Sequence, residues 1–263
     1  MSRRSDVVAV VLSVAFLPLA AFGQTPTASS PQALAYAAQS IAALTGGNPI
    51  TDVTLTGTVT WNAGADTGTA SLKALGTGES RMDLALSTGT RSEIRDAQTG
   101  TPLGQWINPD NTSGQFAPPN CWTDAAWFFP ALGSLAAGQN VVLSYVGQEQ
   151  RNGSNVQHLR SYVFQSAQVP TPTPQQLSTM DFYLDATTLL PVAVAFQVHP
   201  DNNEGMNLAV EVDFSNYQRI SGVAVPLHIQ RYQQGALMVD LTITGTSFNT
   251  GLTLSNFAIV QTT

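Results

Sequence analysis

The fold is decided by residues 206–248, which read MNLAVEVDFSNYQRISGVAVPLHIQRYQQGALMVDLTITGTSF. Apolar residues occupy alternate positions in three runs of this stretch, and the positions between them are mostly polar or small. The runs are 208–214, 223–229 and 237–243. A period of two is typical of β-strands with one buried and one solvated face, and Gly222 and Gly235 mark the turns. The stretch predicts a three-stranded antiparallel meander, which we expect to be the closing wall of a larger curved sheet.

The same alternation recurs on the N-terminal side of the meander and predicts eleven or twelve strands in all. The further runs are 53–61, 70–74, 82–86, 91–95, 103–107, 141–149, 156–164, 181–184 and 192–198. Gly57 interrupts the first run and predicts either a bulge or a bend in a curved sheet. The run at 91–95 is unusually charged, which predicts either an edge strand or a strand facing a solvated cavity. A two-residue turn at 152–153 would place Tyr145 opposite Arg160.

Two segments carry helix signals. Ser30 and the proline that follows it supply a cap and a first-turn proline for a helix ending before Gly46. Apolar residues line one side of this helix: Leu34, Ala37, Ala38, Ile41 and Leu44. Near the middle of the chain, Thr123 or Asp124 can cap a shorter helix that Pro130 ends or kinks after about two turns. We expect the first helix to lie on the sheet.

These elements predict a mainly β (α+β) fold in a single domain spanning residues 30–263. We expect a large curved antiparallel sheet or an unclosed β-barrel, with a few short helices packed on its concave side. The proline-rich segment 170–174 is expected to be a stiff connector between two halves of this one sheet.

Residues 1–23 have the organisation of a secretory signal peptide. A basic start precedes an apolar run at 7–21, and small residues beside Phe22 predict cleavage before Gln24. The apolar run is too short to cross a bilayer, and no later window holds about 18 apolar residues in a row, so we expect no transmembrane span in the mature chain. Residues 24–29 are expected to form a flexible lead. We therefore expect export to the periplasm or the extracellular space.

Composition restricts the classes of partner. Without residues 1–23 the chain has 8 basic and 16 acidic residues, which gives a net charge of −8. Nucleic-acid binding rests on neutralising phosphates, so nucleic acid is not an expected partner. Cys121 is the sole cysteine, which excludes a disulfide scaffold within one chain. For Cys121 we prefer a small buried thiol over an intermolecular bridge or a reactive thiol.

Sequence signals for catalysis and metal binding are weak. The patterns G-x-S-x-G, S-x-x-K and H-E-x-x-H do not occur, and neither do paired cysteines or phosphate-binding glycine motifs. We expect His158, His199 and His228 to be surface or hydrogen-bonded histidines. Glu211 and Asp213 face the same way on one strand, and we interpret them as a solvated sheet face rather than an acid/base pair. We expect a non-enzymatic protein without a metal site or a cofactor.

Short motifs in the last third of the chain resemble those of a known superfamily. The motifs are Tyr-Leu-Asp at 183–185, Leu-Pro-Val at 190–192, Asp-Phe-Ser-Asn-Tyr at 213–217, Gly-Val-Ala-Val-Pro at 222–226, Phe-Asn at 248–249 and a final Phe257. Together they resemble the C-terminal part of LolA-like proteins, the periplasmic lipoprotein-carrier and sensor superfamily. The order of elements along the mature chain is similar too. The whole chain also resembles secreted bacterial proteins that carry an NCWTDAAWFFP-like block.

The resemblance implies an unclosed β-barrel plugged by helices, whose concave side holds acyl chains. Aromatic residues crowd into one segment of this chain: Trp122, Trp127, Phe128 and Phe129. We hypothesise that they form a plug or lid over an apolar concavity that holds a lipid or another hydrophobic ligand. The alternative is that the segment simply completes the core of the protein.

Two other classes of function stay open. A secreted protein- or glycan-interaction module with a self-filled core would use exposed aromatic residues such as Tyr232 and Trp106. An outer-membrane barrel would share the signal peptide and the alternating strands, but the expected helices and proline-rich connector fit lipid-facing strands poorly. We therefore expect an exported, non-enzymatic protein that binds a lipid or another hydrophobe, with an interaction module as the alternative.

Overall fold

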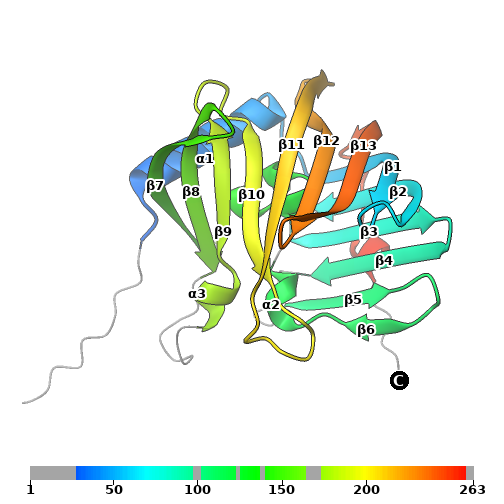
Figure 1. Cartoon of the computed structure of the whole chain (residues 1–263). Coiled ribbons are helices and arrows are strands. Elements are labelled where there is room, and N and C mark those ends of the chain that lie inside the picture. The colour runs from blue at the N-terminus through cyan, green and yellow to red at the C-terminus, as the bar shows by residue number, and fades with distance from the viewer. Residues whose placement is uncertain (1–27, 97–101, 123–124, 137–139, 164–172, 259–263) are drawn as a thin grey trace, which may run out of the picture.

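A computed structural model describes residues 28–96, 102–122, 125–136, 140–163 and 173–258. Within these residues thirteen strands form one antiparallel sheet that does not close into a barrel (Figure 1). The strands are β1 (Asp52–Trp61), β2 (Asp66–Leu75), β3 (Glu79–Leu86), β4 (Gly89–Asp96), β5 (Leu103–Ile107), β6 (Ser113–Gln115), β7 (Val141–Arg151), β8 (Ser154–Val163), β9 (Met180–Asp185), β10 (Pro191–Val198), β11 (Leu208–Ile220), β12 (Val223–Gln233) and β13 (Ala236–Phe248). The helices are α1 (Pro31–Thr45), α2 (Pro118–Cys121) and α3 (Thr173–Leu177), with 3₁₀ turns η1 (Ala125–Trp127), η2 (Pro130–Leu132), η3 (Ser134–Ala136) and η4 (Leu254–Phe257). The predicted class, a curved antiparallel sheet with a few short helices, is confirmed.

The strand order along the sheet is β6-β5-β4-β3-β2-β1-β13-β12-β11-β10-β9-β8-β7. Strand β1 pairs with β13, so the first and last of the described strands meet in the middle of the sheet. The meander at 206–248 is therefore central, and its prediction as the closing wall is wrong. The physical reason is that β1 has an apolar face of its own, formed by Val53, Leu55 and Val59, which continues the buried face of β13.

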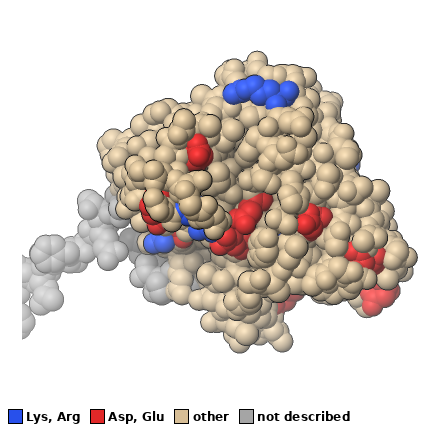
Figure 2. Space-filling view, turned by 45° about the horizontal axis from the view of Figure 1, so that its top comes forward, with Lys and Arg blue, Asp and Glu red and all other residues tan. Residues whose placement is uncertain are grey.

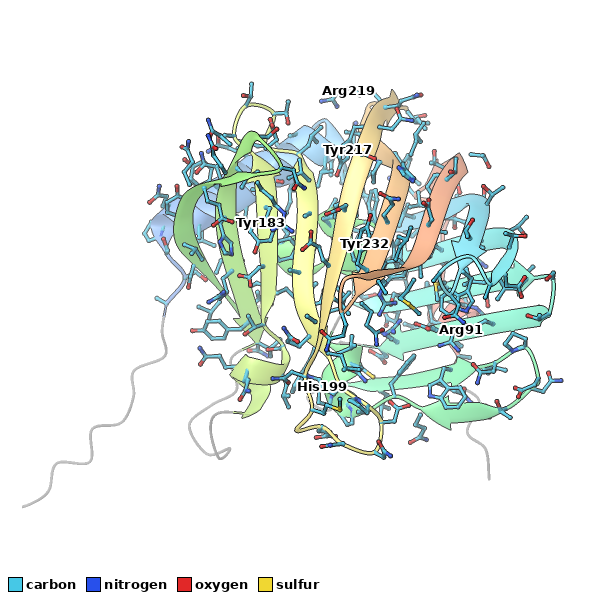
Figure 3. All side chains as sticks on the ribbon, viewed as in Figure 1. Arg91, Tyr183, His199, Tyr217, Arg219 and Tyr232 are labelled. Atoms are coloured by element: carbon cyan, nitrogen blue, oxygen red, sulfur yellow. The ribbon has the colours of Figure 1, made fainter. Side chains whose placement is uncertain are left out.

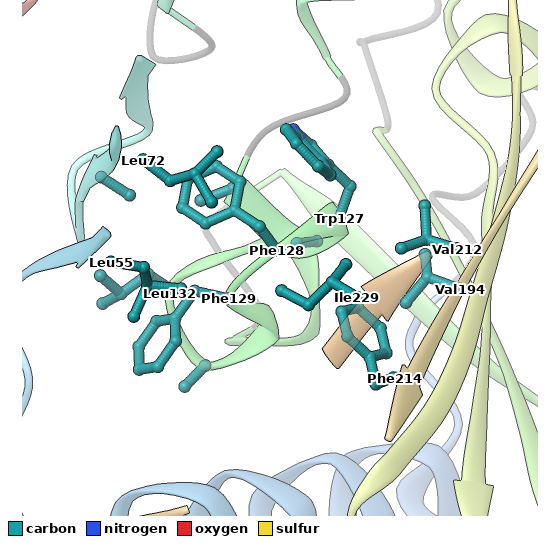
Figure 4. Packing of buried hydrophobic residues seen from close by; sticks show 14 of the residues in the cluster. Leu55, Leu72, Trp127, Phe128, Phe129, Leu132, Val194, Val212, Phe214 and Ile229 are labelled. Carbon is teal, nitrogen blue, oxygen red and sulfur yellow. The ribbon is translucent and has the colours of Figure 1, made fainter. Parts of the chain in front are cut away.

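The core lies on the concave face of the sheet. Figure 1 shows β4–β6 running crosswise to β7–β10, so that the sheet curls around this inner face. Alternate residues of the strands point inward. Leu55 and Leu72 from one half join Val194, Val212 and Ile229 from the other half in a single buried cluster (Figure 4). One continuous core therefore holds the two halves together.

Four register shifts interrupt the pairing of the described strands, and two of them bear on predictions from the sequence. The predicted bulge at Gly57 is confirmed, and a Cβ built there would lie 2.0 Å from the carbonyl oxygen of Thr242, so only glycine fits. A second bulge in β7 places Tyr145 opposite Leu159. The predicted pairing of Tyr145 with Arg160 is wrong because the extra residue in β7 shifts the register by one.

Strand β4 lies inside the sheet, between β3 and β5. The prediction of an edge strand at 91–95 is therefore wrong, because β5 and the three-residue β6 continue the sheet beyond it. Strand β6 was not predicted, since it sits in a stretch rich in turn formers. On the outer face of β4, Ile94 packs under Phe257 of η4. The alternating positions Arg91, Glu93 and Arg95 consequently face the concave side.

Helix α1 begins as predicted, because the side-chain oxygen of Ser30 accepts a hydrogen bond from the backbone N–H of Ala33 at 3.3 Å. Its buried residues are Ala33, Ala37, Ser40, Leu44 and Thr45. The predicted apolar stripe is therefore rotated, and Leu34 is 41% exposed. The helix lies on the sheet as predicted and contacts β7 and β12. Small residues on its buried side let it approach the strands closely.

The segment that follows α2 is a series of short turns rather than the predicted two-turn helix. The turns η1, η2 and η3 succeed one another between residues 125 and 136. Pro130 begins η2, and a proline inside a helix removes one backbone donor and clashes with the preceding turn. The predicted caps Thr123 and Asp124 lie outside the described residues.

Several predicted features fall outside the described residues: the signal peptide at 1–23, the lead up to residue 27 and the connector up to residue 172. The end of the lead contacts β7, because the backbone N–H of Leu143 donates to Ser29 Oγ at 3.0 Å. Among the described residues, no helix is long and apolar enough to span a membrane. Figure 2 shows that charged side chains are sparse on the face in view.

Candidate functional site

The aromatic segment that the sequence predicts as a plug or lid lies inside the core. Trp127, Phe128 and Phe129 are 2%, 1% and 0% exposed, and all three belong to the main core cluster (Figure 4). The rings of Trp127 and Phe128 meet edge to face, with centroids 5.0 Å apart. Trp122 is only half-buried and lies outside that cluster. The structure thus brings three of the four predicted residues together, as packed core.

A hollow of about 390 Å³ opens in the concave face beside this segment, and we call it the inner hollow. Residues of β1, β4, β5, β12 and β13 and of the loop after β10 converge on it. Its apolar lining includes Trp61, Trp106, Phe116, Val198, Leu208 and Met238. Figure 3 labels two of its polar lining residues, Arg91 on β4 and His199 directly after β10.

A buried carboxylate in the inner hollow is held by two arginines of its own strand. Glu93 Oε1 accepts hydrogen bonds from Arg91 Nη2 at 2.6 Å and from Arg91 Nε at 3.2 Å. Glu93 Oε2 accepts a hydrogen bond from Arg95 Nη2 at 2.8 Å. Alternate residues of a strand share one face, so the pattern Arg-Ser-Glu-Ile-Arg sets these three side chains side by side.

Strand β12 adds a third guanidinium from Arg231. Its Cζ lies 5.5 Å from the ring centroid of Trp127. None of the ion pairs within 4.0 Å among the described residues involves Arg231. Burial lowers the pKa of Arg231 to about 10; Glu93 opposes this shift, while Arg95 and Arg91 add to it. Arg231 therefore has electrostatic neighbours of both signs but, within the described part of the chain, no counter-ion in direct contact.

Arg91, Glu93, Arg95 and Arg231 together form what we call the arginine cluster. Burial on its own would raise the pKa of Glu93, but the charges of Arg95, Arg91 and Arg231 outweigh it and bring the pKa to about 2. The guanidinium of Arg91 also lies over the ring of Trp61, with Cζ 5.0 Å from the centroid. With Glu93 ionised, the cluster carries two net positive charges in a largely buried place.

The loop after β10 lines the hollow with further polar groups. The backbone N–H of His199 donates to Asn120 Oδ1, and Asn120 Nδ2 donates to the carbonyl oxygen of His199, both at 2.7 Å. His199 is 3% exposed, and its Nδ1 lies 3.2 Å from the carbonyl oxygen of Met206. A carbonyl only accepts, so Nδ1 carries the proton. Nε2 of His199 is buried and has no hydrogen-bond partner among the described residues.

Sequence reasoning missed the arginine cluster, although two signals for it exist. Charged residues occupy 91, 93 and 95, on one face of a predicted strand. Arg231 stands at the position where the apolar alternation of 223–229 continues, which places it on the buried face. Of the two alternatives for 91–95, the cavity agrees with the structure, because Arg91, Glu93 and Arg95 line the inner hollow.

A second hollow, of about 720 Å³, lies on the outer face of the sheet. Glu211 and Asp213 line it together, which agrees with their predicted common face, and Arg151 forms an ion pair with Glu211. Tyr232 lines this outer hollow as well, whereas Trp106 lines the inner hollow. The structure therefore does not bring together the two aromatic residues considered for glycan binding.

Replacement of Asp213 by asparagine is expected to stabilise the protein at alkaline pH. Burial, followed by the charge of Glu211, raises the pKa of Asp213 to about 6 from its usual 3.8, while Arg151 opposes the shift. The wild type therefore loses stability as the pH rises from 3.8 through 6. At pH 8 the free energy of unfolding of Asp213→Asn should exceed that of the wild type by about 1 kcal/mol, after allowance for solvent screening.

Urea unfolding curves at pH 8 and at pH 4 test this effect, because the gain should vanish at the lower pH. An equal gain at both pH values would contradict a charge-based origin.

Other candidate chemistry is weak in the structure. Among the residues that the structure describes, no three or more His, Cys, Asp or Glu side chains are arranged to hold a metal ion. Cys121 is buried, as the preferred interpretation of the sequence has it, and burial raises the pKa of its thiol to about 12. At neutral pH this thiol is protonated and shielded from solvent.

No protein-family model and no curated protein sequence matches the chain. Among solved structures, a putative outer membrane lipoprotein-sorting protein domain from Vibrio parahaemolyticus is 14% identical, with a TM-score of 0.53 over 85% of this chain and 95% of that one. A LolA superfamily protein from Nitrosomonas europaea is 9% identical, with a TM-score of 0.54 over 86% and 97% of the two chains. At such identities the likeness concerns the fold alone. The chain therefore has the LolA-like fold, an open antiparallel sheet curled around short helices.

Proposed function

We propose that this protein is an exported, non-enzymatic binding protein that takes up a lipid or another hydrophobic ligand in the inner hollow. The observation that carries the proposal is the hollow itself, which opens in the concave face next to the core and has aromatic and aliphatic walls. Apolar pockets with a few polar groups are the usual form of a small-molecule site. The fold supports the proposal, because similar structures include a putative outer membrane lipoprotein-sorting protein domain.

In this proposal the aromatic segment supports the binding site rather than covering it. Trp127, Phe128 and Phe129 fill the core behind the hollow. The guanidinium of Arg231, which lines the hollow, stacks on the ring of Trp127. Trp122 is half-buried and is available to act as a lid residue. The ligand itself would contact Leu208 and Met238, which remain partly exposed in the hollow.

The proposal is tested on purified mature protein in two steps. Solvent extraction followed by mass spectrometry should recover a co-purified hydrophobe, and dodecan-1-ol should displace a fluorescent hydrophobic probe. Leu208→Gln is expected to weaken dodecan-1-ol binding about tenfold, because a polar group replaces an apolar wall. Leu103→Gln is the matched control, since Leu103 is 49% exposed and does not line the hollow.

Absence of an extracted lipid together with absence of probe binding would overturn the proposal. Glycan-array binding without lipid would instead favour the interaction-module alternative. N-terminal sequencing of the exported protein should begin at Gln24, which tests the proposed export and its cleavage site.

A further inference from the structure

We propose that the inner hollow selects amphiphiles with an acidic headgroup, a carboxylate or a phosphate, and that the arginine cluster binds this headgroup. This inference rests on the proposed function and names the chemical class of its ligand. Arg231 provides the direct contact, with Arg91 and Arg95 beside it, while the apolar walls of the hollow receive the hydrocarbon chain.

The charge balance of the hollow is the first argument. Its charged lining residues are Arg91, Arg95 and Arg231 against Glu93 and Asp201. The Asp201 carboxylate is already engaged, because it accepts hydrogen bonds from the Trp106 indole N–H at 2.9 Å and from the backbone N–H of Ala117 at 3.0 Å. A net positive charge therefore remains in the hollow, although the chain as a whole carries a net charge of −7.

The second argument is that the cluster has more arginines than are needed to neutralise Glu93 in a purely structural ion pair. One guanidinium is enough to balance Glu93, and each further buried charge without a counter-ion costs several kcal/mol of desolvation. Three of the ten basic residues in the full sequence converge on this single carboxylate. An anionic ligand would supply the missing counter-charge and would form charge-assisted hydrogen bonds, which are stronger than neutral ones.

Unsatisfied polar atoms at the hollow provide an independent argument. Arg95 is 6% exposed and His199 is 3% exposed, so both side chains are more than nine-tenths buried. Arg95 Nε and His199 Nε2 have no hydrogen-bond partner among the described residues. Buried polar atoms in proteins are nearly always hydrogen-bonded, and unpaired ones need an explanation. An acidic headgroup in the hollow offers acceptors to the guanidinium groups, including the unpaired Nε of Arg95.

The arrangement of the guanidinium groups also favours a planar or tetrahedral oxyanion. Arg91 stacks over Trp61, Arg95 over Phe116 with Cζ 4.4 Å from the ring centroid, and Arg231 over Trp127. Stacking fixes the plane of a guanidinium and leaves its N–H edges clear of the ring. The nitrogens of Arg91 are already hydrogen-bonded to Glu93 and Asn108, so Arg231 and the unpaired Nε of Arg95 are the donors that suit carboxylate or phosphate oxygens. The rings of Trp61 and Phe116 also line the hollow, so a headgroup and a hydrocarbon chain can be bound side by side.

A series of ligands with the same dodecyl chain tests the inference without any mutation. Displacement of a neutral fluorescent hydrophobe from the wild type should show dodecanoate and dodecyl phosphate binding at least tenfold more tightly than dodecan-1-ol. Dodecyltrimethylammonium should bind most weakly. Inorganic phosphate and acetate distinguish a free anion from a headgroup, because neither should raise the melting temperature as dodecyl phosphate does at equal concentration.

The matched variants are Arg231→Gln and Arg219→Gln. Arg231→Gln should reduce the affinity for dodecanoate about tenfold and leave the affinity for dodecan-1-ol unchanged. Arg219 lies away from the hollow and donates to the carbonyl oxygens of Gly222 and Ala43, so Arg219→Gln should bind both ligands like the wild type. Circular dichroism establishes that each variant is folded, and the wild-type ligand series decides the question if one is not.

The possible failures are distinguishable. Equal binding of dodecanoate and dodecan-1-ol by the wild type would overturn the acidic headgroup and leave the hydrophobic site intact. A stabilisation by inorganic phosphate equal to that by dodecyl phosphate would overturn the amphiphile in favour of a free anion. Absence of binding by every dodecyl ligand would overturn the proposed function itself.

Discussion

Glu93→Gln is expected to lower the free energy of unfolding by about 3 kcal/mol at pH 7, because removal of one partner from a buried ion pair is strongly destabilising. Glutamine has nearly the shape of glutamate but no charge. Arg91 and Arg95 would lose their hydrogen-bonded counter-ion, and Arg231 would face two like charges without compensation. Urea denaturation followed by tryptophan fluorescence measures the loss.

The loss should depend on pH in a definite direction. Glu93 has a pKa of about 2 in the folded protein, against a usual value of 4.5. Its ionised form therefore stabilises the wild type fully above pH 4.5, and this contribution is lost as the pH falls toward 2. The difference between wild type and Glu93→Gln should be constant from pH 7 to pH 5 and should shrink below pH 4.5.

Asp83→Asn is the matched control for this experiment. Asp83 pairs with Arg81 on the neighbouring strand β3, where both side chains are partly exposed, and such a pair contributes less than about 1 kcal/mol. Equal losses for Glu93→Gln and Asp83→Asn would contradict the central role of Glu93 in the arginine cluster. Addition of dodecanoate should restore part of the stability of Glu93→Gln, because its carboxylate replaces the missing charge.

Trp127→Ala is expected to lower the free energy of unfolding by about 3 to 5 kcal/mol, because the loss of a large buried ring leaves a cavity. Trp127 is almost fully buried and contacts the edge of Phe128. Its ring also stacks against the guanidinium of Arg231, and the variant would lose this contact. Thermal and urea unfolding of the purified variant give the size of the effect.

Trp122→Ala is the natural comparison, since Trp122 belongs to the same aromatic segment but is half-buried. Its loss of stability should stay below about 1 kcal/mol. A Trp127→Ala protein of wild-type stability that no longer binds the hydrophobic probe would contradict the core position and favour the lid hypothesis.

Much of the fold follows from local sequence pattern. Alternating apolar residues locate almost every strand, because burial of one face of a sheet imposes a period of two. Ser30 and Pro31 locate the start of α1 by capping physics alone. The local pattern does not indicate which strands pair with each other in the sheet. The pairing of β1 with β13 depends on contacts between residues nearly the whole described chain apart, and the prediction for the meander failed there.

The candidate site was less predictable for the same reason. Arg91, Glu93 and Arg95 are visible as a charged strand, but Arg231 reaches them only through the curvature of the sheet. The aromatic segment is conspicuous because four aromatic residues lie close together in the sequence. Three of them are ordinary core, since Pro130 and the short 3₁₀ turns fold Trp127, Phe128 and Phe129 inward. Composition shows that such a segment is apolar, but it does not indicate whether the segment packs into the protein's own core or over a ligand cavity.

The meeting of β1 and β13 in the middle of the sheet also determines how the chain must fold. Val53 pairs with Phe248 and Trp61 with Val239, so these contacts close a loop that contains most of the protein. Contacts between residues so distant in sequence give a high contact order and slow folding. Until β13 is available, β1 and β12 each present an unpaired edge, and such edges can pair with other chains. The strand pairing that unites the two halves is thus also the step at which unfinished molecules are most exposed to aggregation.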